Sequence, residues 1–232
     1  MDDAKTRTRR HILEAAADIL EREGAEGVST RSVAAAAGIR AASLYQLFGD
    51  KEGLLAALAI QAFDHYLADK HTIAPTADPV EDMRRGWDAH VNFGLGHPAA
   101  YLLMFGTDRP GRWPPAADEA HNLLLKFLDR VAAAGRLRVP PALAAHLCQA
   151  AATGVTLSLI ATPAPDRDLK ISAKMRETVV GSLITDPPPD PDPGLASRAL
   201  ALDAALSTAD EPLPLRPAET ALLRDWLQQL AG

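Results

Sequence analysis

The sequence predicts an all-α protein with a small N-terminal domain and a larger C-terminal one. Apolar residues recur every three or four positions in most segments, which places them on one face of a helix. No segment shows the sustained alternation of apolar and polar residues that marks a half-buried strand. The chain has 232 residues, of which 47% are hydrophobic, and this suffices for two domains with apolar cores.

Composition argues against several other classes of protein. The single cysteine, Cys148, cannot form an intramolecular disulfide, so nothing indicates an oxidising compartment. Acidic residues interrupt the first apolar stretch, which therefore does not resemble a secretory signal. The uncharged segment Leu147 to Pro165 contains polar residues, and its strongly apolar part is shorter than the ~20 residues that cross a bilayer. We expect a buried core helix there, and a cytoplasmic protein with no membrane partner.

The charge distribution of the N-terminal region is compatible with one basic face. The net charge of the chain is −6, and residues 1–55 hold eight Lys and Arg against nine Asp and Glu. Most acidic residues lie on the first predicted helix or just after it, whereas most basic ones lie near the start of that helix or around the next two. The early basic residues are expected to form a loose arm attracted to phosphates: Lys5, Arg7, Arg9 and Arg10.

The first fifty residues have the pattern of a helix-turn-helix. Apolar residues at helical spacing predict a helix from Thr6 to Glu23, which Gly24 ends. Ser29 and the threonine after it both suit the N-cap of a short helix that stops at Gly38. A second short helix is predicted from about Ala41 to Phe48, and Asp50 is suited to cap a longer helix after it. Two short helices joined by a glycine turn suit the major groove of DNA.

Several short motifs in this region resemble the N-terminal domain of the TetR family of transcriptional regulators in order and spacing. These motifs are Ala15-Ala16, Gly24, Ser29-Thr30, Ala37-Gly38-Ile39, Ser43-Leu44-Tyr45, Phe48 and Lys51-Glu52. The resemblance implies a DNA-binding domain at residues 1–55 and a ligand-binding and dimerisation domain at residues 56–232. It further implies a repressor that binds a palindromic DNA operator as a homodimer.

The resemblance assigns nine residues to DNA contact: Thr30, Arg31, Arg40, Ala41, Ala42, Ser43, Tyr45, Gln46 and Lys51. Tyr45 and Lys51 match the phosphate contacts of the family, and the residues from Arg40 to Gln46 match its base-reading surface. This chain has Leu47 where the family often has a histidine, so any contact through that histidine is absent. Tyr45 could instead be a core aromatic, but Leu44 and Phe48 already supply the buried side of this helix, which favours a surface role. Without the surrounding motif, Arg31 and Arg40 would suit solvated surface positions.

The C-terminal region is predicted to be a set of amphipathic helices. Their approximate ranges are 79–96, 99–105, 116–134, 140–161, 168–183, 195–206 and 218–230, with a proline-rich linker at 186–193. The stretch from Gly86-Trp87 to Tyr101 resembles a group of TetR proteins with a Trp-containing helix before an Asn/His-Pro-x-x-Tyr segment. The helix at 140–161 carries Ala150, Ala151 and Gly154, which suit close packing in a dimer with 168–183 as its partner.

We expect a small, largely apolar effector to bind among these C-terminal helices. The candidate lining is Trp87, His90, Val91, Phe93, Tyr101, Met104, Phe105, Trp113, His121, Leu125, His146 and Thr153. An aromatic and methionine stripe at helical spacing also suits an ordinary core, and a histidine on an apolar face also suits a satisfied core group. Each of these residues therefore has a structural alternative.

Two other functions are alternatives to a ligand-responsive regulator. An enzyme would need a nucleophile, a metal cluster or a phosphate loop, and the sequence predicts none of these and no cofactor. Local spacing predicts no metal site either, because the seven histidines form no His-x-x-x-His or Glu-x-x-His pair. A constitutive DNA-binding protein that senses no ligand remains open at this point. We therefore expect a regulator and not an enzyme.

Overall fold

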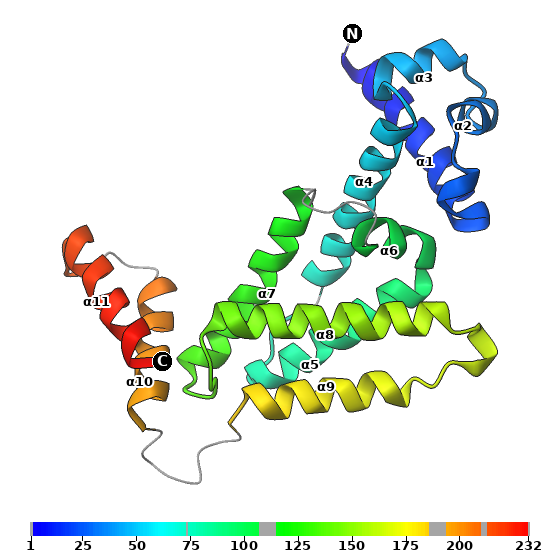
Figure 1. Ribbon diagram of the computed structural model, residues 1–232. Helices are drawn as coiled ribbons and strands as arrows, with labels where there is room; N and C mark the ends of the chain where they lie inside the picture. Colours follow the sequence, from blue (N-terminus) through cyan, green and yellow to red (C-terminus); the bar gives the residue numbers. More distant parts are fainter. Residues whose placement is uncertain (1, 73, 107–114, 186–193, 210–212, 232) are drawn as a thin grey trace. The chain divides into compact units, whose positions relative to one another are not determined.

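The computed structural model describes every residue except 1, 73, 107–114, 186–193, 210–212 and 232. Across the described residues the chain is helical, and its one β-type contact there is an isolated bridge between Leu137 and Ile184. The all-α prediction is confirmed (Figure 1). The elements are α1 (Asp2–Gly27), α2 (Thr30–Ala36), α3 (Ala41–Phe48), α4 (Lys51–His71), α5 (Pro79–Gly96), α6 (Pro98–Phe105), α7 (Pro115–Ala133), α8 (Pro141–Ala161), η1 (Ala164–Asp166), α9 (Lys170–Leu183), α10 (Gly194–Ser207) and α11 (Pro217–Ala231).

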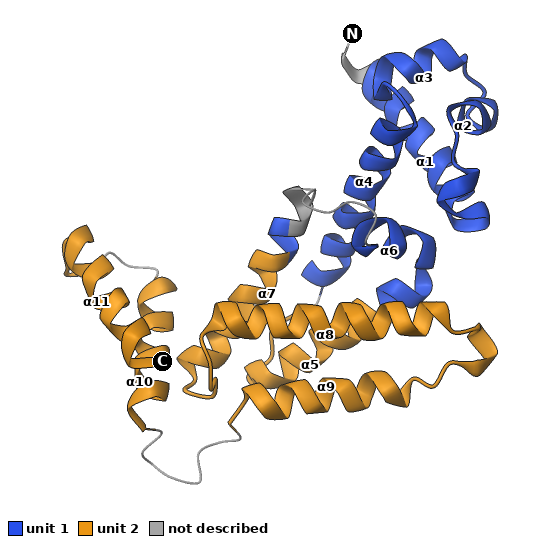
Figure 2. Cartoon of the chain, viewed as in Figure 1, with its two compact units in different colours: residues 1–72, 92–120 blue, residues 73–91, 121–232 orange. Residues whose placement is uncertain are grey.

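The chain folds into two compact units (Figure 2). Unit 1 comprises residues 1–72 and 92–120, and unit 2 comprises residues 73–91 and 121–232. Two helices, α5 and α7, contribute residues to both units. The division into compact units does not test where the DNA-binding domain ends, so the boundary after residue 55 stays a prediction.

Unit 1 is built around the first four helices, with α6 packed against α1 and α4. One apolar cluster joins α1 to α4, and its fully buried members are Ile12, Ala16, Val28, Val33, Leu44 and Leu54. Ala99 and Ala100 of α6 pack against the same cluster, and the Ala100 amide donates to Glu21 Oε1 at 3.3 Å. A helix from beyond the predicted DNA-binding domain is therefore tied to α1.

The loose basic arm predicted at the start of the chain is wrong, because these residues lie within α1. Alanine, lysine and arginine are good helix formers, and no proline or glycine separates them from the apolar part of the helix. Arg9 lies 4.6 Å above the Phe48 ring and donates to the Leu47 carbonyl at 3.4 Å. The predicted end is confirmed in position, since Gly24 interrupts the helical backbone with a φ of 70°.

Unit 2 contains a second apolar cluster and a fully buried carboxylate. Val80 and Leu128 are fully buried in this cluster, which draws on α5, α7, α8, α9 and α10. Asp82 accepts hydrogen bonds from Arg130 Nη1 at 2.6 Å and from the Thr76 amide at 2.9 Å, while Arg130 also donates to the Thr76 carbonyl. These bonds fix the segment before α5 to both α5 and α7.

Helix α8 is only partly a core helix. It is long and apolar enough to cross a membrane by length and composition alone, a test that the core helix of a soluble protein also passes. Ala144, Ala145 and Cys148 are buried in unit 2, and burial raises the pKa of the Cys148 thiol to about 12. Leu143 and Leu147 on its other side are exposed. The expectation of a buried helix therefore holds for one face only.

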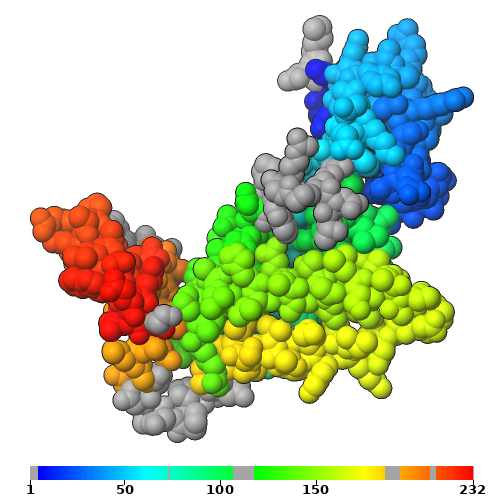
Figure 3. All heavy atoms as spheres, in the orientation of Figure 1, coloured from blue at the N-terminus to red at the C-terminus, as the bar shows by residue number. Residues whose placement is uncertain are grey.

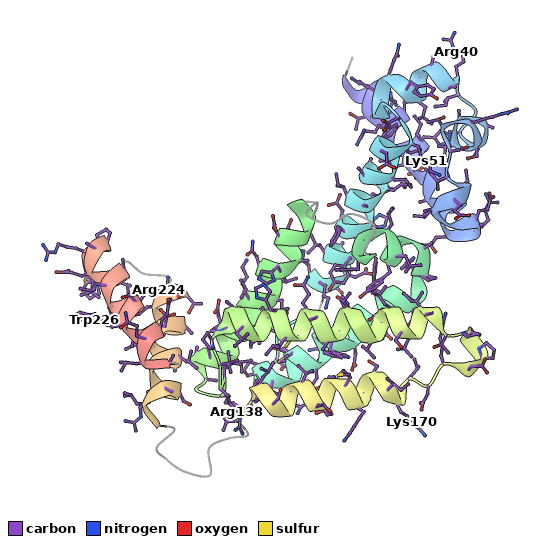
Figure 4. All side chains as sticks on the ribbon, in the orientation of Figure 1. Arg40, Lys51, Arg138, Lys170, Arg224 and Trp226 are labelled. Carbon is purple, nitrogen blue, oxygen red and sulfur yellow. The ribbon has the colours of Figure 1, made fainter. Side chains whose placement is uncertain are left out.

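The last two helices, α10 and α11, pack against each other as a hairpin. Leu227 is buried in this hairpin, and Arg224 of α11 donates to Asp203 of α10 at 2.7 Å. Trp226, labelled in Figure 4, is exposed on α11. The proline-rich linker predicted before this hairpin lies outside the described residues.

Candidate nucleic-acid interface

Helix α2 is held at its start by a capping box. Ser29 Oγ accepts from the Ser32 amide at 3.0 Å, and Ser32 Oγ accepts from the Ser29 amide at 3.0 Å. Ser32 Oγ also lies 2.9 Å from the Gly27 carbonyl, to which it donates. The predicted N-cap at Ser29 is confirmed, and this reciprocal bonding fixes the start of α2 relative to the end of α1.

The turn between α2 and α3 depends on Gly38, whose φ is 63°. This left-handed conformation is accessible to glycine without the steric cost that a side chain imposes. The Gly38 amide donates to the Ala35 carbonyl, and the Ile39 amide donates to the Ala34 carbonyl at 3.0 Å. The turn therefore satisfies the last carbonyls of α2 and sends the chain directly into α3.

Helix α3 has one buried face and one exposed face. Leu44 and Phe48 are buried in the cluster of unit 1. Side chains on the opposite face are exposed: Arg40 at the N-cap, Ala41, Ala42, Tyr45 and Gln46. Figure 4 shows the Arg40 side chain extending away from the start of α3. Ser43 is half-buried at the edge between the faces.

Tyr45 links the exposed surfaces of α2 and α3. Its side chain is 52% exposed, and its hydroxyl lies 3.3 Å from Thr30 Oγ1. This exposure excludes the alternative of a core aromatic. Arg31, the next residue of α2, is also exposed. Thr30 and Tyr45 thus form one polar surface that continues from the start of α2 onto the middle of α3.

Lys51 lies at the N-terminus of α4, where backbone amides are available to an anion. Asp50 caps this helix, since its Oδ1 accepts from the Gly53 amide at 2.8 Å, as its position predicts. Lys51 itself is half-buried, and Figure 4 labels it on the first turn of α4. The positive side chain and the positive helix end therefore lie together.

Two residues important for this geometry were missed by the sequence interpretation. Arg9 fixes α1 to the end of α3 through Phe48, and its place three residues before Ile12 is the helical spacing that signals this. Gly53 is required by close packing, because a Cβ atom there would lie 2.0 Å from the Phe48 carbonyl oxygen. No sequence pattern indicates that contact.

The candidate ligand residues divide between the two units. In unit 1, Phe93, Tyr101 and Phe105 join Phe63 and Tyr66 in a cluster of aromatic rings with centroids 4.6 to 6.4 Å apart in the contacting pairs. Met104 is buried on the same helix as two of these rings. Lys70, which the sequence interpretation missed, has its Nζ 5.3 Å from the centre of the Tyr66 ring, and burial lowers its pKa to about 8.

In unit 2 the candidates have different surroundings. Trp87 is buried and its Nε1–H donates to Ser172 Oγ of α9 at 3.0 Å, which is a structural role. His121 Nδ1 lies 3.1 Å from Gln149 Oε1, and His146 is next to His121. The remaining candidates in this unit are His90 and Val91, which are buried, and Leu125 and Thr153, which are half-buried. Trp113 lies outside the described residues.

Two short helices around a glycine turn, braced by α1 and α4 and open on one polar face, define a helix-turn-helix DNA-binding domain. Residues 12–58 match the family model described as bacterial regulatory proteins of the tetR family. Residues 12–58 therefore form a DNA-binding domain of the TetR type, as the sequence motifs predicted. The finer resemblance of the C-terminal region to one group of the family stays a prediction.

Solved structures of TetR-family regulators share this fold. One from Pectobacterium atrosepticum is 19% identical, with a TM-score of 0.63 over 81% of this chain and 100% of its own. PfmR from Thermus thermophilus is 25% identical, with a TM-score of 0.55 over 74% of this chain and 95% of its own. FadR from Bacillus subtilis, solved in complex with stearoyl-CoA, is 15% identical, with a TM-score of 0.62 over 74% of this chain and 97% of its own. No curated protein matches the chain.

Proposed function

We propose that this regulator is a repressor that binds a palindromic DNA operator as a homodimer and leaves it when a small, largely apolar ligand binds. The DNA-binding part rests on the structure of α3, a short helix with one buried apolar face and one exposed polar face. Such a helix, held by a second short helix across a glycine turn, fits the major groove. Residues 1–55 form the DNA-binding domain in this proposal.

The candidate DNA-contacting residues of α2, α3 and α4 have two kinds of role in this proposal. Thr30, Tyr45 and Lys51 position the domain on phosphates, and Arg31 contributes to the same surface. Side chains along α3 contact base edges: Arg40, Ser43 and Gln46 by hydrogen bonds, and Ala41 and Ala42 by apolar contact with thymine methyl groups. Because residues 1–55 carry no net positive charge, affinity depends on these few placed groups.

Helices α8 and α9 support the homodimer. They pack side by side in unit 2 and form one continuous surface in the space-filling view (Figure 3). Exposed residues follow the same i, i+4, i+7, i+11 spacing on both helices: Leu143, Leu147, Ala150 and Gly154 on α8, and Ile171, Met175, Thr178 and Ser182 on α9. Apart from its neighbours in α8, no described atom lies within 4 Å of where a Cβ atom of Gly154 would stand, so another backbone can approach there.

We propose that these stripes from two chains form a four-helix bundle. Two recognition helices related by the twofold axis would then read half-sites about 34–36 Å apart. A single α3 contacts few bases, so pairing two of them supplies the specificity that one lacks. Residues 56–232 are thus assigned to ligand binding and dimerisation.

The proposed effector is small and largely apolar because the candidate residues are mostly aromatic or aliphatic, with few polar groups among them. FadR, which shares the fold, was solved with stearoyl-CoA. Fatty acyl thioesters and free fatty acids are therefore the first compounds to test. Tyr101, Met104 and Phe105 lie on α6, which packs against α1 and α4, so ligand binding at α6 has a direct route to the DNA-binding helices.

The mechanism proposed is a population shift between two dimer conformations. Helix α4 runs without interruption from Lys51 to His71, so a displacement along it reaches the proposed phosphate contact. A ligand releases DNA in this scheme only as far as it binds the released conformation more tightly than the DNA-bound one.

Recovery of genomic DNA fragments on the full-length protein tests the DNA-binding part, followed by affinity measurements on the recovered site at several salt concentrations. Lys51→Ala is expected to weaken binding to all sequences and to reduce the salt slope by about one for each lost phosphate contact. Lys126→Ala, which removes an exposed lysine of α7, is the matched control and should leave both unchanged. If the two variants bound DNA with the same affinity and the same salt slope, the assignment of Lys51 to a phosphate contact would be contradicted.

A thermal-shift screen read beside operator binding tests the ligand part. Compounds that raise the melting temperature and release DNA support a ligand-responsive repressor. A broad set of apolar compounds with no effect on either would favour a constitutive DNA-binding regulator, the second candidate function.

A further inference from the structure

Two histidines from different helices of unit 2 lie side by side. His121 of α7 and His146 of α8 have ring centroids 5.2 Å apart, with the ring planes inclined by 53°. His121 is half-buried and His146 is exposed, so solvent reaches the pair. No local spacing predicts this contact, because the two residues are far apart in the sequence and only the packing of α7 beside α8 joins them.

Both rings are held through Nδ1. His146 Nδ1–H donates to the Ala142 carbonyl at 2.8 Å, and His121 Nδ1–H donates to Gln149 Oε1 at 3.1 Å. A neutral imidazole that donates through Nδ1 carries its lone pair on Nε2. Within the described part of the chain, no hydrogen bond engages either Nε2. The bonding of both rings therefore matches the outer-shell bonding that orients metal-binding histidines.

The ring separation also fits one ion between the two Nε2 atoms. A Zn–N bond is about 2.0–2.1 Å long, and the ring centre lies roughly 1.1–1.2 Å beyond the nitrogen, so each centre lies about 3.2 Å from the ion. At a tetrahedral angle, two such centres are about 5.2 Å apart. The observed separation is 5.2 Å. The distance between the two ring centres is therefore the one that a bis-imidazole site requires.

We propose that His121 and His146 together bind one divalent transition-metal ion, with Zn²⁺ as the preferred species. Imidazole suits Zn²⁺, Cu²⁺ and Ni²⁺, whereas Mg²⁺ and Ca²⁺ prefer oxygen ligands. Among the described residues no group of three or more His, Cys, Asp or Glu is placed to hold a metal. The described residues therefore supply two ligands, and water or an oxygen-bearing small molecule completes the coordination.

This inference does not rest on the proposed function, because metal binding is measured without DNA or effector. A bound ion would cross-link α7 to α8, whose other exposed residues form part of the proposed dimer surface. The alternative is an ordinary contact between two rings, in which adding a metal changes nothing. A saturable metal-binding site exists only if the proposal is correct.

Calorimetric titration of the full-length, tag-free and EDTA-treated protein with Zn²⁺ tests the proposal. One ion is expected per chain, and Co²⁺ is expected to show the intense visible absorption of tetrahedral coordination. His121→Asn and His146→Asn should each abolish saturable binding, because one imidazole remains. Gln149→Leu keeps both ligands and should weaken binding by about 10–100-fold. His65→Asn, at an exposed histidine of α4, is the matched control and should bind like the unaltered protein.

Three outcomes would overturn the proposal. The first is the absence of saturable Zn²⁺ binding to the unaltered protein. The second is unchanged Zn²⁺ binding in both histidine variants, which would place the ion elsewhere. The third is equally tight Mg²⁺ binding, which would indicate an oxygen site. Circular dichroism checks that each variant is folded. If His121→Asn does not fold, the result for His146→Asn, at an exposed position, decides the test.

Discussion

Helices α3 and α8 each bury one face and leave the other open, yet their open faces differ in chemistry. The open face of α3 carries arginine, tyrosine and glutamine together with two alanines, whereas that of α8 carries leucines and small residues. An exposed apolar stripe favours a protein partner, and an exposed polar surface at a helix-turn-helix favours DNA. The open faces of the two helices thus indicate two different partners.

The two helices also differ in what fixes their positions. Helix α3 has eight residues, too few to be stable alone, and is held by the glycine turn, by Arg9 and by its buried Leu44 and Phe48. Helix α8 has 21 residues and packs along α9. Perturbing α8 at its open face should therefore change assembly and leave the fold of the protomer intact, whereas α3 is sensitive to small local changes.

The largest expected effect comes from a charge on the apolar face of α8. Leu147 is 46% exposed in the protomer, so Leu147→Glu should leave its fold unchanged. In the proposed dimer the substitution buries two unpaired carboxylates, each at a cost of several kcal/mol. Sedimentation velocity should show a monomer, and operator affinity should fall because the half-sites are no longer bound together.

The matched control is Ile60→Glu on α4, where an isoleucine is exposed to a similar degree, at 42%. This variant should remain dimeric. A Leu147→Glu protein that stays dimeric at the same concentration would contradict the assignment of α8 to the dimer surface.

The next effect concerns Asp82, which joins the segment before α5 to α7. Burial alone raises the pKa of Asp82, but hydrogen bonds from Thr76 and Arg130 outweigh it, so the pKa lies below its ordinary value. Asp82→Asn should lower the free energy of unfolding by about 3 kcal/mol, the low end for buried pairs because Arg130 retains access to solvent.

The pH dependence of that loss follows from the direction of the pKa shift. A carboxylate with a depressed folded pKa stabilises the protein fully above its unfolded pKa of about 3.9, and the contribution is lost as pH falls through the folded value. Denaturant unfolding at several pH values should show a constant difference between the variant and the unaltered protein near neutrality, and a shrinking one below about pH 4. Asp88→Asn, at an exposed ion pair with Arg176, should cost only about 0–1 kcal/mol.

The helix-turn-helix was largely predictable because its signals are local. Ser29, Gly38 and Asp50 act within a few residues of their place in the chain, and the structure has them as the cap, turn and cap that their positions indicate. Leu44 and Phe48 are one turn apart, so helical spacing alone places them on one buried face. The sequence therefore predicts the fold of this region and which side of α3 is open.

The remaining features depend on contacts between distant parts of the chain. The pairing of His121 with His146, the buried bonds of Asp82 and the packing of α6 on α1 each join segments that no periodicity relates. Trp87 suited a ligand site by its position, but its bond to Ser172 of α9 explains its burial equally well. One sequence shows which face of a helix is apolar, and it does not show which helix covers that face.

A smaller effect is expected at the polar face of α3. Arg40→Ala should weaken operator binding by about 1–3 kcal/mol and relax the preference at one base position, because a bidentate base contact is lost. Dimerisation should be unaffected, the reverse of the Leu147 result. Binding measurements on operators altered one base pair at a time check this, and an equal loss on every sequence would reassign Arg40 to phosphate contact.

The last prediction tests whether the position of α3 relies on close backbone packing. A Cβ atom at Gly53 would lie 2.0 Å from the Phe48 carbonyl oxygen, so Gly53→Ala must displace the end of α3 or the start of α4. We expect a stability loss of about 3 kcal/mol, the upper end for overpacking, because the atom that the Cβ would meet is backbone and not the end of a flexible side chain. Operator affinity should fall with it, since Lys51 and α3 lie on either side of the contact, while the dimer persists.

Gly96→Ala is the control for this prediction, because a Cβ atom there meets no described atom within 4 Å. It should leave stability and operator binding nearly unchanged. If Gly53→Ala lowered stability without changing operator affinity, the end of α3 would have moved without disturbing the DNA-binding face. The sensitivity attributed to α3 would then come from its caps and its buried side chains alone.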